Sequence, residues 1–264
     1  GELLITDNFF DLLELFEVKD NIFNINIRNK YVRYFYKKIL LKVVLIGLNF
    51  LAKIKIISSC YASREILKGF SVEGTSYEHR KGFFPILFVY PGFFQSEKFF
   101  KKENLMDLKI KSQYLDKANI FLNEMSSGII FFVHIRMGDY IDYVVLGKKD
   151  SRLPFKYYQK QIKSLQKKNK KCSFVFLTDD LDYVRENFNW VENSAFSKES
   201  VFVDFAIMTL CDGGIMSNSS FSWWGSYFNS DSKILIAPKY WTGFKSGIEF
   251  PKGISPSFAD VVNI

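Results

Sequence analysis

The chain has 264 residues, of which 48% are hydrophobic and 18% aromatic, a composition typical of a globular protein and not of a disordered one. Its three cysteines lie far apart and its two histidines show no metal-ligand spacing, which argues against a disulfide framework and a structural zinc site. The formal net charge of +8 would suit a nucleic-acid binder, but the chain carries no recognisable motif of that class. We therefore expect no nucleic-acid partner.

The first distinctive segment, residues 28–68, is basic and apolar at once. It holds ten Lys or Arg against one acid, and lysines interrupt each long apolar run. A membrane span of ~20 predominantly apolar residues does not fit this pattern. Two interpretations stay open: a basic amphipathic helix lying on an anionic membrane surface, or an ordinary domain helix with exposed lysines. The cysteine usage indicates a cytoplasmic location, and the first interpretation adds a peripheral position on the inner membrane face.

The pattern along the chain changes near residue 128. Before it, the sequence predicts helical and irregular segments with one strand at 86–90. After it, apolar runs of strand length alternate with helical patterns, which predicts a parallel sheet in an α/β fold. The predicted strands are 129–133, 173–177, 201–203, 215–216 and 233–238. Helices are expected after Pro154, after Asp179 or Asp180, from Asp204 through Leu210 with Gly213-Gly214 as its stop signal, and from Phe221.

Polar clusters follow three of these strands, at 134–140, 178–180 and 217–225. Ligands of parallel sheets bind at the carboxyl ends of the strands, so we expect these clusters to form one site. The planar fork of Arg136 can hold a diphosphate, and Ser219 and Ser220 stand at a helix start that favours an anion. No acidic pair is spaced to hold a metal. The adjacent Asp179 and Asp180 suit a nucleotide base or ribose better.

Each cluster also has a purely structural interpretation. His134 could be a hydrogen-bonded core histidine, and Arg136 with Asp139 an ion pair. The Ser/Asn run could be only a helix cap, and Trp223-Trp224 only core. Their position at successive strand ends of one sheet favours a site over these alternatives.

Two segments resemble signature motifs of a known family. HIRMGDY at 134–140 and SNSSFSWWGSYFN at 217–229 look like those of the α-1,2-fucosyltransferases, glycosyltransferase family 11. GFFQSEKFF at 92–100 and IAPK at 236–239 resemble two further stretches of the same family. The family usually opens with a strand and a Gly-rich loop that this sequence lacks, so we expect a chain incomplete at its N-terminus or a divergent member.

The resemblance implies a GT-B-like α/β fold of two Rossmann-like halves, the first incomplete at its N-terminus. We expect an acceptor-side half at 1–127 and a nucleotide-sugar donor half at 128–264. It also implies that Arg136 holds the β-phosphate. The other expected donor-binding residues are His134, Asp179, Asp180, Asn218, Ser219, Ser220 and Phe221. Asp139 is expected as a catalytic base, with Glu97 as an alternative, and Gln95 and Glu97 on the acceptor side.

The function implied is inverting transfer of L-fucose from GDP-fucose to a galactoside hydroxyl, in α-1,2 linkage, without metal or other cofactor. The expected acceptor is a galactose-terminated oligosaccharide, free or lipid-linked, of a bacterial O-antigen or capsule. Two alternatives remain: a transferase that uses another sugar nucleotide, and a truncated chain that binds the donor without turnover. A peripheral membrane contact through 28–68 would suit a lipid-linked acceptor.

Overall fold

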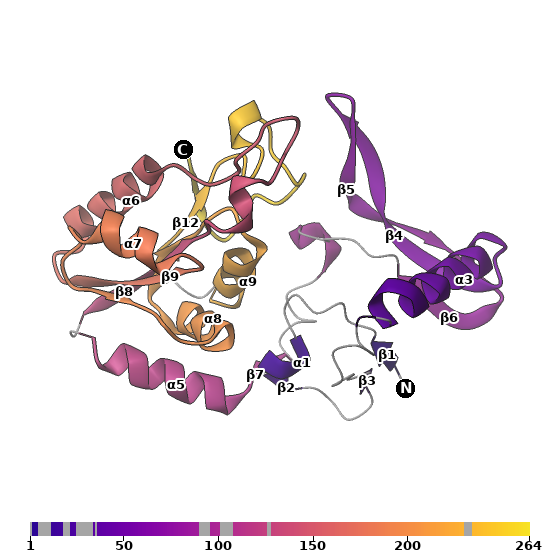
Figure 1. Cartoon of the computed structure of the whole chain (residues 1–264), viewed down its shortest axis with the longest axis horizontal. Coiled ribbons are helices and arrows are strands. Elements are labelled where there is room, and N and C mark those ends of the chain that lie inside the picture. Colours follow the sequence, from indigo (N-terminus) through magenta and orange to yellow (C-terminus); the bar gives the residue numbers. More distant parts are fainter. Residues whose placement is uncertain are drawn as a thin grey trace. The chain divides into compact units, whose positions relative to one another are not determined.

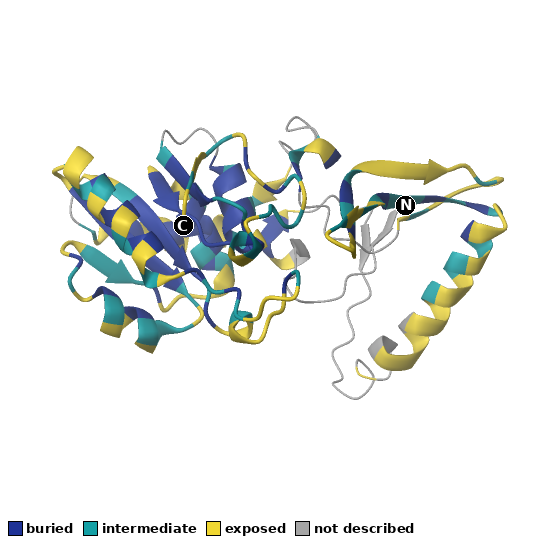
Figure 2. Ribbon diagram, turned by 90° about the horizontal axis from the view of Figure 1, so that it is seen from above, coloured by how far each residue is buried: buried dark blue, intermediate teal, exposed yellow. Residues whose placement is uncertain are grey.

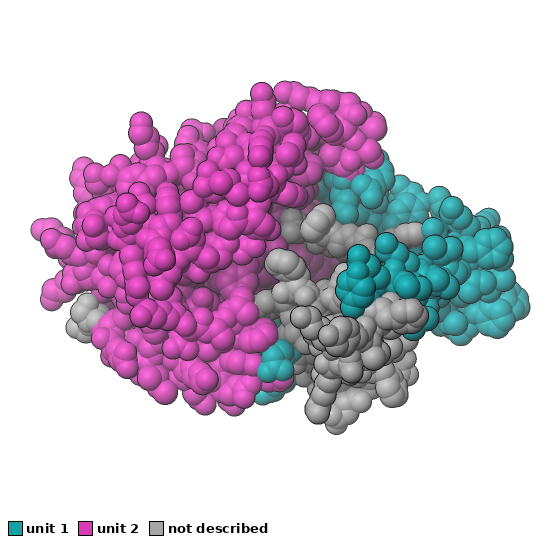
Figure 3. Space-filling view, in the orientation of Figure 1, with its two compact units in different colours: residues 1–65, 73–94, 101–109 teal, residues 66–72, 95–100, 110–264 magenta. Residues whose placement is uncertain are grey.

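The computed structural model describes residues 2–4, 12–17, 22–24, 34, 36–89, 96–100, 108–125, 128–229 and 234–264. The chain forms two compact units (Figures 1 and 3). The first holds residues 1–65, 73–94 and 101–109, and the second residues 66–72, 95–100 and 110–264. The second unit begins earlier than the predicted boundary at 127/128, because helix α5 (Ser112–Asn123) packs against helix α8 (Val201–Leu210) inside it.

The second unit is built on a six-stranded sheet in the order β10-β9-β8-β11-β12-β13, and every neighbouring pair in it is parallel. This confirms the predicted α/β fold with a parallel sheet. The strands are β8 (Ile129–Ile135), β9 (Cys172–Thr178), β10 (Ser194–Phe196), β11 (Gly213–Ile215), β12 (Ile234–Pro238) and β13 (Asp260–Val262).

Alternate side chains of β8 enter two different layers, as the period of a strand requires. Phe131, Val133 and Ile135 join the core beneath α6 (Phe155–Lys168) and α7 (Leu181–Phe188). On the other face, the His134 ring lies 5.4 Å from that of Phe221 in α9 (Ser220–Phe228), which packs on α8. The sheet is therefore covered on both sides, and Figure 2 colours its strands mostly as buried.

Two predicted elements of this unit are wrong. The expected strand at 201–203 is the first turn of α8, because the Ser200 side chain accepts a hydrogen bond from the Val203 N–H and caps a helix there. Asp204 therefore lies inside the helix instead of capping it. Helix α8 ends at Leu210 as predicted, but Gly213 and Gly214 are not its stop signal, because they belong to β11. A Cβ at Gly214 would lie 2.3 Å from the Phe132 ring, so the close packing of neighbouring strands requires a glycine.

A hairpin that the sequence pattern did not predict lies mostly in the first unit, and its tip, residues 66–72, is assigned to the second. Strands β4 (Ile57–Leu67) and β5 (Phe70–Arg80) are joined by Lys68 and Gly69, both with positive φ (48° and 82°), the geometry of a two-residue hairpin turn. Strand β6 (Phe84–Val89), which matches the strand predicted at 86–90, pairs with β4 in parallel. The prediction of only helical and irregular structure around it is wrong. Neither β4 nor β5 keeps a strict alternation of polar and apolar residues, and their turn lacks the Asn-Gly or Asp-Gly signal of a hairpin.

Helix α3 (Leu41–Lys53), preceded by the π-helical turn η1 (Tyr36–Leu40), occupies the basic stretch. Val43, Ile46 and Phe50 lie on one side of it and are 60–70% exposed, so they do not pack inside the unit (Figure 2). No helix among the described residues is long and apolar enough to cross a membrane. The remaining short elements are α1 (Leu12–Leu15), β1 (Glu2–Leu4) paired in parallel with β3 (Ile22–Asn24), and β2 (Phe16–Glu17) paired with β7 (Lys109–Ile110).

Candidate donor-binding site

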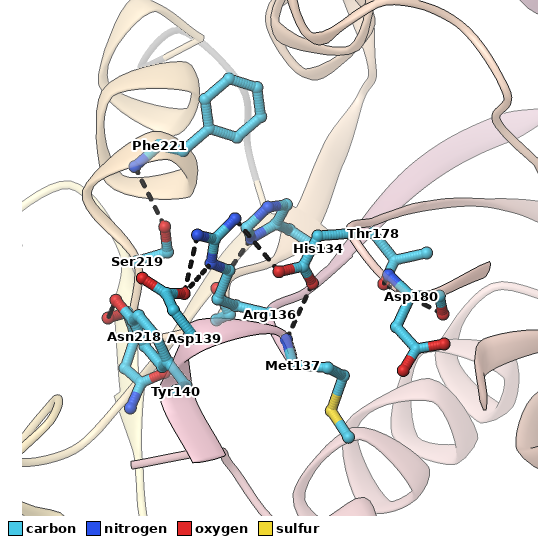
Figure 4. Close-up of polar contacts among 12 residues, drawn as sticks. His134, Arg136, Met137, Asp139, Tyr140, Thr178, Asp180, Asn218, Ser219 and Phe221 are labelled. Atoms are coloured by element: carbon cyan, nitrogen blue, oxygen red, sulfur yellow. Dashed lines mark hydrogen bonds and ion pairs between the residues drawn. The ribbon is translucent and has the colours of Figure 1, made fainter. Parts of the chain in front are cut away.

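The three predicted polar clusters meet at one edge of the large sheet. Strands β9, β8 and β11 are parallel neighbours, so the residues that follow them emerge side by side. Arg136 follows β8, Asp179 follows β9, and Ser217 lies two residues beyond the end of β11. The expectation that these segments form one cluster is confirmed, and Figure 4 shows their contacts.

The guanidinium of Arg136 lies at the centre of the cluster (Figure 4). Its Nε and Nη2 both donate to Asp139 Oδ1, at 3.1 and 2.8 Å. Its Nη1 lies 3.1 Å from Asp179 Oδ2. The Arg136 side chain is only 24% exposed, so its guanidinium is partly shielded from water. An ionic hydrogen bond is stronger in such a place than at the fully exposed surface.

The two aspartates after β9 do different things. Asp179 accepts a hydrogen bond from the Met137 N–H at 2.8 Å, in addition to its ion pair with Arg136. Asp180 caps α7, because its Oδ1 accepts from the Tyr183 N–H at 3.0 Å. This confirms that one of the pair caps the helix; contact of either residue with a nucleotide base or ribose stays a prediction.

His134 is buried, with its Nδ1 2.7 Å from Ser217 Oγ. Burial, followed by the positive charge of Arg136, lowers the pKa of His134 to about 3, so the ring is neutral at physiological pH. The Ser217 side chain lies in the same buried network, within 3.5 Å of Ser222 Oγ. His134 therefore supports the turn between β11 and α9 from below.

The turn itself carries the predicted anion-binding residues. Ser219 is the N-cap of α9, and its Oγ accepts from the Phe221 N–H at 3.3 Å. Ser220 is the first helical residue and is exposed. The start of α9 thus lies at the same sheet edge as Arg136, and its dipole favours a negative charge there.

Asn218 connects this turn to the loop after β8. The Asn218 Nδ2 donates to the backbone carbonyl of Ser151 at 2.7 Å, and the backbone carbonyl of Asn218 accepts from the Tyr140 hydroxyl at 3.1 Å. Burial raises the pKa of Tyr140 to about 12, so this hydroxyl keeps its proton. Tyr140 and Ser151 were not predicted as site residues, although Tyr140 stands within the 134–140 motif. The Oδ1 atom of Asn218 is buried and has no hydrogen-bond partner among the described residues.

The structure describes one of the two acceptor-side candidates, Glu97. Gln95 lies outside the described residues. Glu97, in the short turn η2 (Glu97–Phe99), accepts from both the N–H and the hydroxyl of Ser257, at 2.7 and 3.0 Å. Because both carboxylate oxygens of Glu97 are engaged in this way, Asp139 is the better placed of the two candidate bases.

No group of three or more His, Cys, Asp or Glu side chains that could hold a metal ion occurs within the described part of the chain. A hollow of about 400 Å³ lies beyond the ends of β12 and β13, and none of the predicted site residues lines it. It is lined by Pro154, Lys239, Tyr240, Phe244, Lys245, Asn263 and Ile264. The Arg136 cluster is therefore a feature of the sheet edge and not of this hollow.

Two curated relatives from Escherichia coli are each 30% identical to the chain over the matched stretch. The O-antigen biosynthesis glycosyltransferase WbnK matches over 115 residues, which are 41% of this chain and 38% of that protein. An α-1,2-colitosyltransferase matches over 164 residues, which are 57% of this chain and 54% of that protein. The chain thus spans about half, or less, of the length of these curated relatives.

Among solved structures, the α-1,6-fucosyltransferase NodZ soaked with GDP-fucose is 13% identical, with a TM-score of 0.38, over 50% of this chain and 46% of that chain. The family model described as Glycosyl transferase family 11 matches residues 17–247, a range that includes all the predicted site residues. This match confirms the resemblance carried by the motifs at 134–140 and 217–229. The chain belongs to glycosyltransferase family 11.

Proposed function

We propose that the protein transfers L-fucose from GDP-fucose to a galactoside hydroxyl of a cell-surface glycan, in α-1,2 linkage and without a metal. The observation that carries the proposal is the Arg136 fork beside the start of α9, at the carboxyl ends of β8 and β11. A cationic fork and a helix N-terminus together can take up the negative charge of a nucleoside diphosphate.

In the proposed reaction the acceptor oxygen attacks the anomeric carbon, and the bond from that carbon to the β-phosphate oxygen breaks. The electron pair leaves with GDP, and the developing charge is stabilised by Arg136 and by the N–H groups that begin α9. A base takes the proton of the acceptor hydroxyl; Asp139 is the proposed base. Attack from the face opposite the phosphate inverts the anomeric configuration.

The acceptor is proposed to be a galactose-terminated oligosaccharide of an O-antigen or capsule. Support comes from the relative WbnK, which is described as an O-antigen biosynthesis glycosyltransferase. A second candidate donor is another sugar nucleotide, because the other relative is described as a colitosyltransferase. Donor binding without turnover is the remaining alternative, since the matched stretches cover only part of each relative.

Calorimetry with GDP, UDP and a short oligonucleotide tests the donor class first. We expect binding of GDP, weaker binding of UDP and none of the oligonucleotide. Incubation with GDP-fucose and a galactose-terminated oligosaccharide should then yield a product with an α-1,2 linkage, read by nuclear magnetic resonance. Preference for UDP would contradict the proposed donor. GDP binding without product from any GDP-sugar would leave the chain as a donor-binding module.

A further inference from the structure

Arg136 is held by two carboxylates that differ in their freedom to move. Asp179 is 25% exposed and lies 3.1 Å from Nη1. Asp139 is 62% exposed and accepts from Nε and Nη2 through a single oxygen. One positive charge is thus shared by two negative ones, so an incoming anion must replace a carboxylate or enter a site of net negative charge.

Asp179 is fixed by the backbone around it. The register of the sheet pairs Ile135 with Thr178, which brings the residues after each strand side by side. Asp179 Oδ1 then accepts from the Met137 N–H, while Oδ2 faces Arg136. Gly138 makes room for this carboxylate, because a Cβ there would lie 2.6 Å from Asp179 Oδ2. With both oxygens engaged, Asp179 can hold the arginine in one orientation.

Asp139 lies on the single turn η3 (Asp139–Ile141) and covers a different edge of the guanidinium. The Nε–Nη2 edge carries two parallel N–H groups, the arrangement that binds a carboxylate or a phosphate through two bonds. In this structure Asp139 holds that edge, and its exposed side chain can turn away into water without leaving a buried charge behind.

We propose that Asp179 is a positioning residue for Arg136, and that Asp139 is a placeholder that the donor diphosphate displaces from the Nε–Nη2 edge. This inference rests on the proposed function, since it takes a nucleoside diphosphate as the arriving anion. It also couples two events: the carboxylate proposed as the base is released from its ion pair only when the donor is bound.

The two aspartates are expected to differ in their effect on anion binding, whereas simple electrostatics predicts the same effect for both. Each aspartate carries one negative charge near the same guanidinium, so if charge alone mattered, removing either would strengthen the binding of an anion. If Asp139 competes with the ligand and Asp179 orients the arginine, the two removals act in opposite directions.

The experiment is calorimetric titration of GDP into wild type, Asp139→Asn and Asp179→Asn, with thermal unfolding as a check of folding. We expect Asp139→Asn to bind GDP about fivefold more tightly, as for loss of an exposed competing ion pair. Asp179→Asn should bind at least about tenfold more weakly, because an ionic contact that holds Arg136 is lost. The proposal would be overturned if both variants changed the GDP affinity in the same direction. It would also be overturned if Asp139→Asn bound GDP more weakly and Asp179→Asn more tightly.

Asp142→Asn is the matched control, because Asp142 is an exposed carboxylate of the same loop that pairs with Lys149 and not with Arg136. Its GDP affinity should stay within about twofold of wild type. A second readout needs no nucleotide: ¹⁵N relaxation of the Arg136 Nε–H group, with the signal assigned through Arg136→Lys. The group should stay ordered in Asp139→Asn and become mobile in Asp179→Asn. An ordered Arg136 in Asp179→Asn would refute the positioning role even if the wild type bound no GDP, whereas failure to bind GDP alone would refute the proposed function.

Discussion

The fork of Arg136 supplies the charge on which the proposed chemistry depends. Arg136→Ala should lower transfer activity by about 100-fold or more, because a donor aimed at the developing negative charge is lost. Arg136→Lys should recover little, since an ammonium keeps the charge but not the planar fork. Initial rates with GDP-fucose measure both variants, and circular dichroism checks their folding.

Arg152→Ala serves as the control for this series. Arg152 belongs to the loop after β8 as well, but it pairs with Asp150 at 2.7 Å and not with an aspartate of the strand-end cluster. We expect near-normal activity for this variant. Arg136→Ala protein that folds normally and retains activity within a factor of a few of wild type would contradict the assignment.

His134 should make the protein sensitive to acid. The folded-state pKa of His134, about 3, lies below the ordinary histidine value of 6.5, so the unfolded chain binds a proton more readily than the folded one. The stability contributed by the neutral ring is therefore present above pH 6.5 and is lost as the pH falls from there toward 3. Within this window each pH unit lowers the unfolding free energy by at most about 1.4 kcal/mol.

Urea unfolding of His134→Gln at a series of pH values tests this. The variant should lose less stability than wild type between about pH 6 and pH 4, because the titrating group is absent. His79→Gln, which replaces the exposed histidine of β5, should keep the wild-type slope. Parallel slopes for wild type and His134→Gln would show that His134 does not titrate in this window.

At the scale of elements, β11 depends on having no side chain at Gly214. An alanine Cβ would lie 2.3 Å from Phe132 Cδ1, so Gly214→Ala should destabilise the second unit by about 1–3 kcal/mol. Adding Phe132→Leu should recover part of the loss by making room. Gly47→Ala is the opposite case: apart from the adjacent residues and the backbone of α3 itself, no atom of the described residues lies within 4 Å of the added Cβ. Alanine also favours a helix by about 0.5–1 kcal/mol. Chemical unfolding of these three variants beside wild type measures the changes in unfolding free energy. A Gly214→Ala protein as stable as wild type would refute the packing argument.

Helix α3 has an exposed apolar side. Val43, Ile46 and Phe50 leave an exposed apolar side flanked by Lys42 and Lys53. We propose that it lies on an anionic membrane surface, where each lysine near the lipid contributes about 1 kcal/mol before screening. Co-sedimentation with vesicles containing anionic lipid should be strong at low salt and weak at high salt.

Two variants separate the contributions to this binding. Lys42→Glu with Lys53→Glu should abolish the salt-sensitive part, and Ile46→Ser with Phe50→Ser should weaken binding at every salt concentration. No binding of wild type at low salt, or binding that ignores both salt and lipid charge, would rule the membrane contact out.

For the whole molecule, we predict that the proposed reaction needs no metal, because Arg136 and the start of α9 can provide the positive potential that a divalent ion would otherwise supply. Transfer activity should therefore survive EDTA, and added Mn²⁺ should at most speed product release. Rates measured with and without the chelator check this. Activity that EDTA abolishes and Mn²⁺ restores would reveal a metal site.

The local pattern of the sequence was enough for the main strands of the donor unit and for its site edge. The continuous apolar runs at 129–133 and 173–177 became β8 and β9, because they have the length of strands and a parallel strand buried on both faces carries such a run. The motif at 134–140 and the Ser/Asn run at 217–220 therefore had to emerge where parallel strands end. Each of these predictions used only residues that lie close together in the sequence.

Tertiary structure decided what local pattern leaves open. The run 201–203 fits strand and helix periods equally well, and the Ser200 cap and the packing of α8 on α5 selected the helix. The partners of Arg136 also depended on the fold. Asp139 is three residues away from Arg136 in the sequence, but Asp179, which contacts both Arg136 and the neighbouring Met137, lies 42 residues beyond Met137. Such contacts depend on the register between β8 and β9, which is fixed by packing across the whole sheet and not by any single segment.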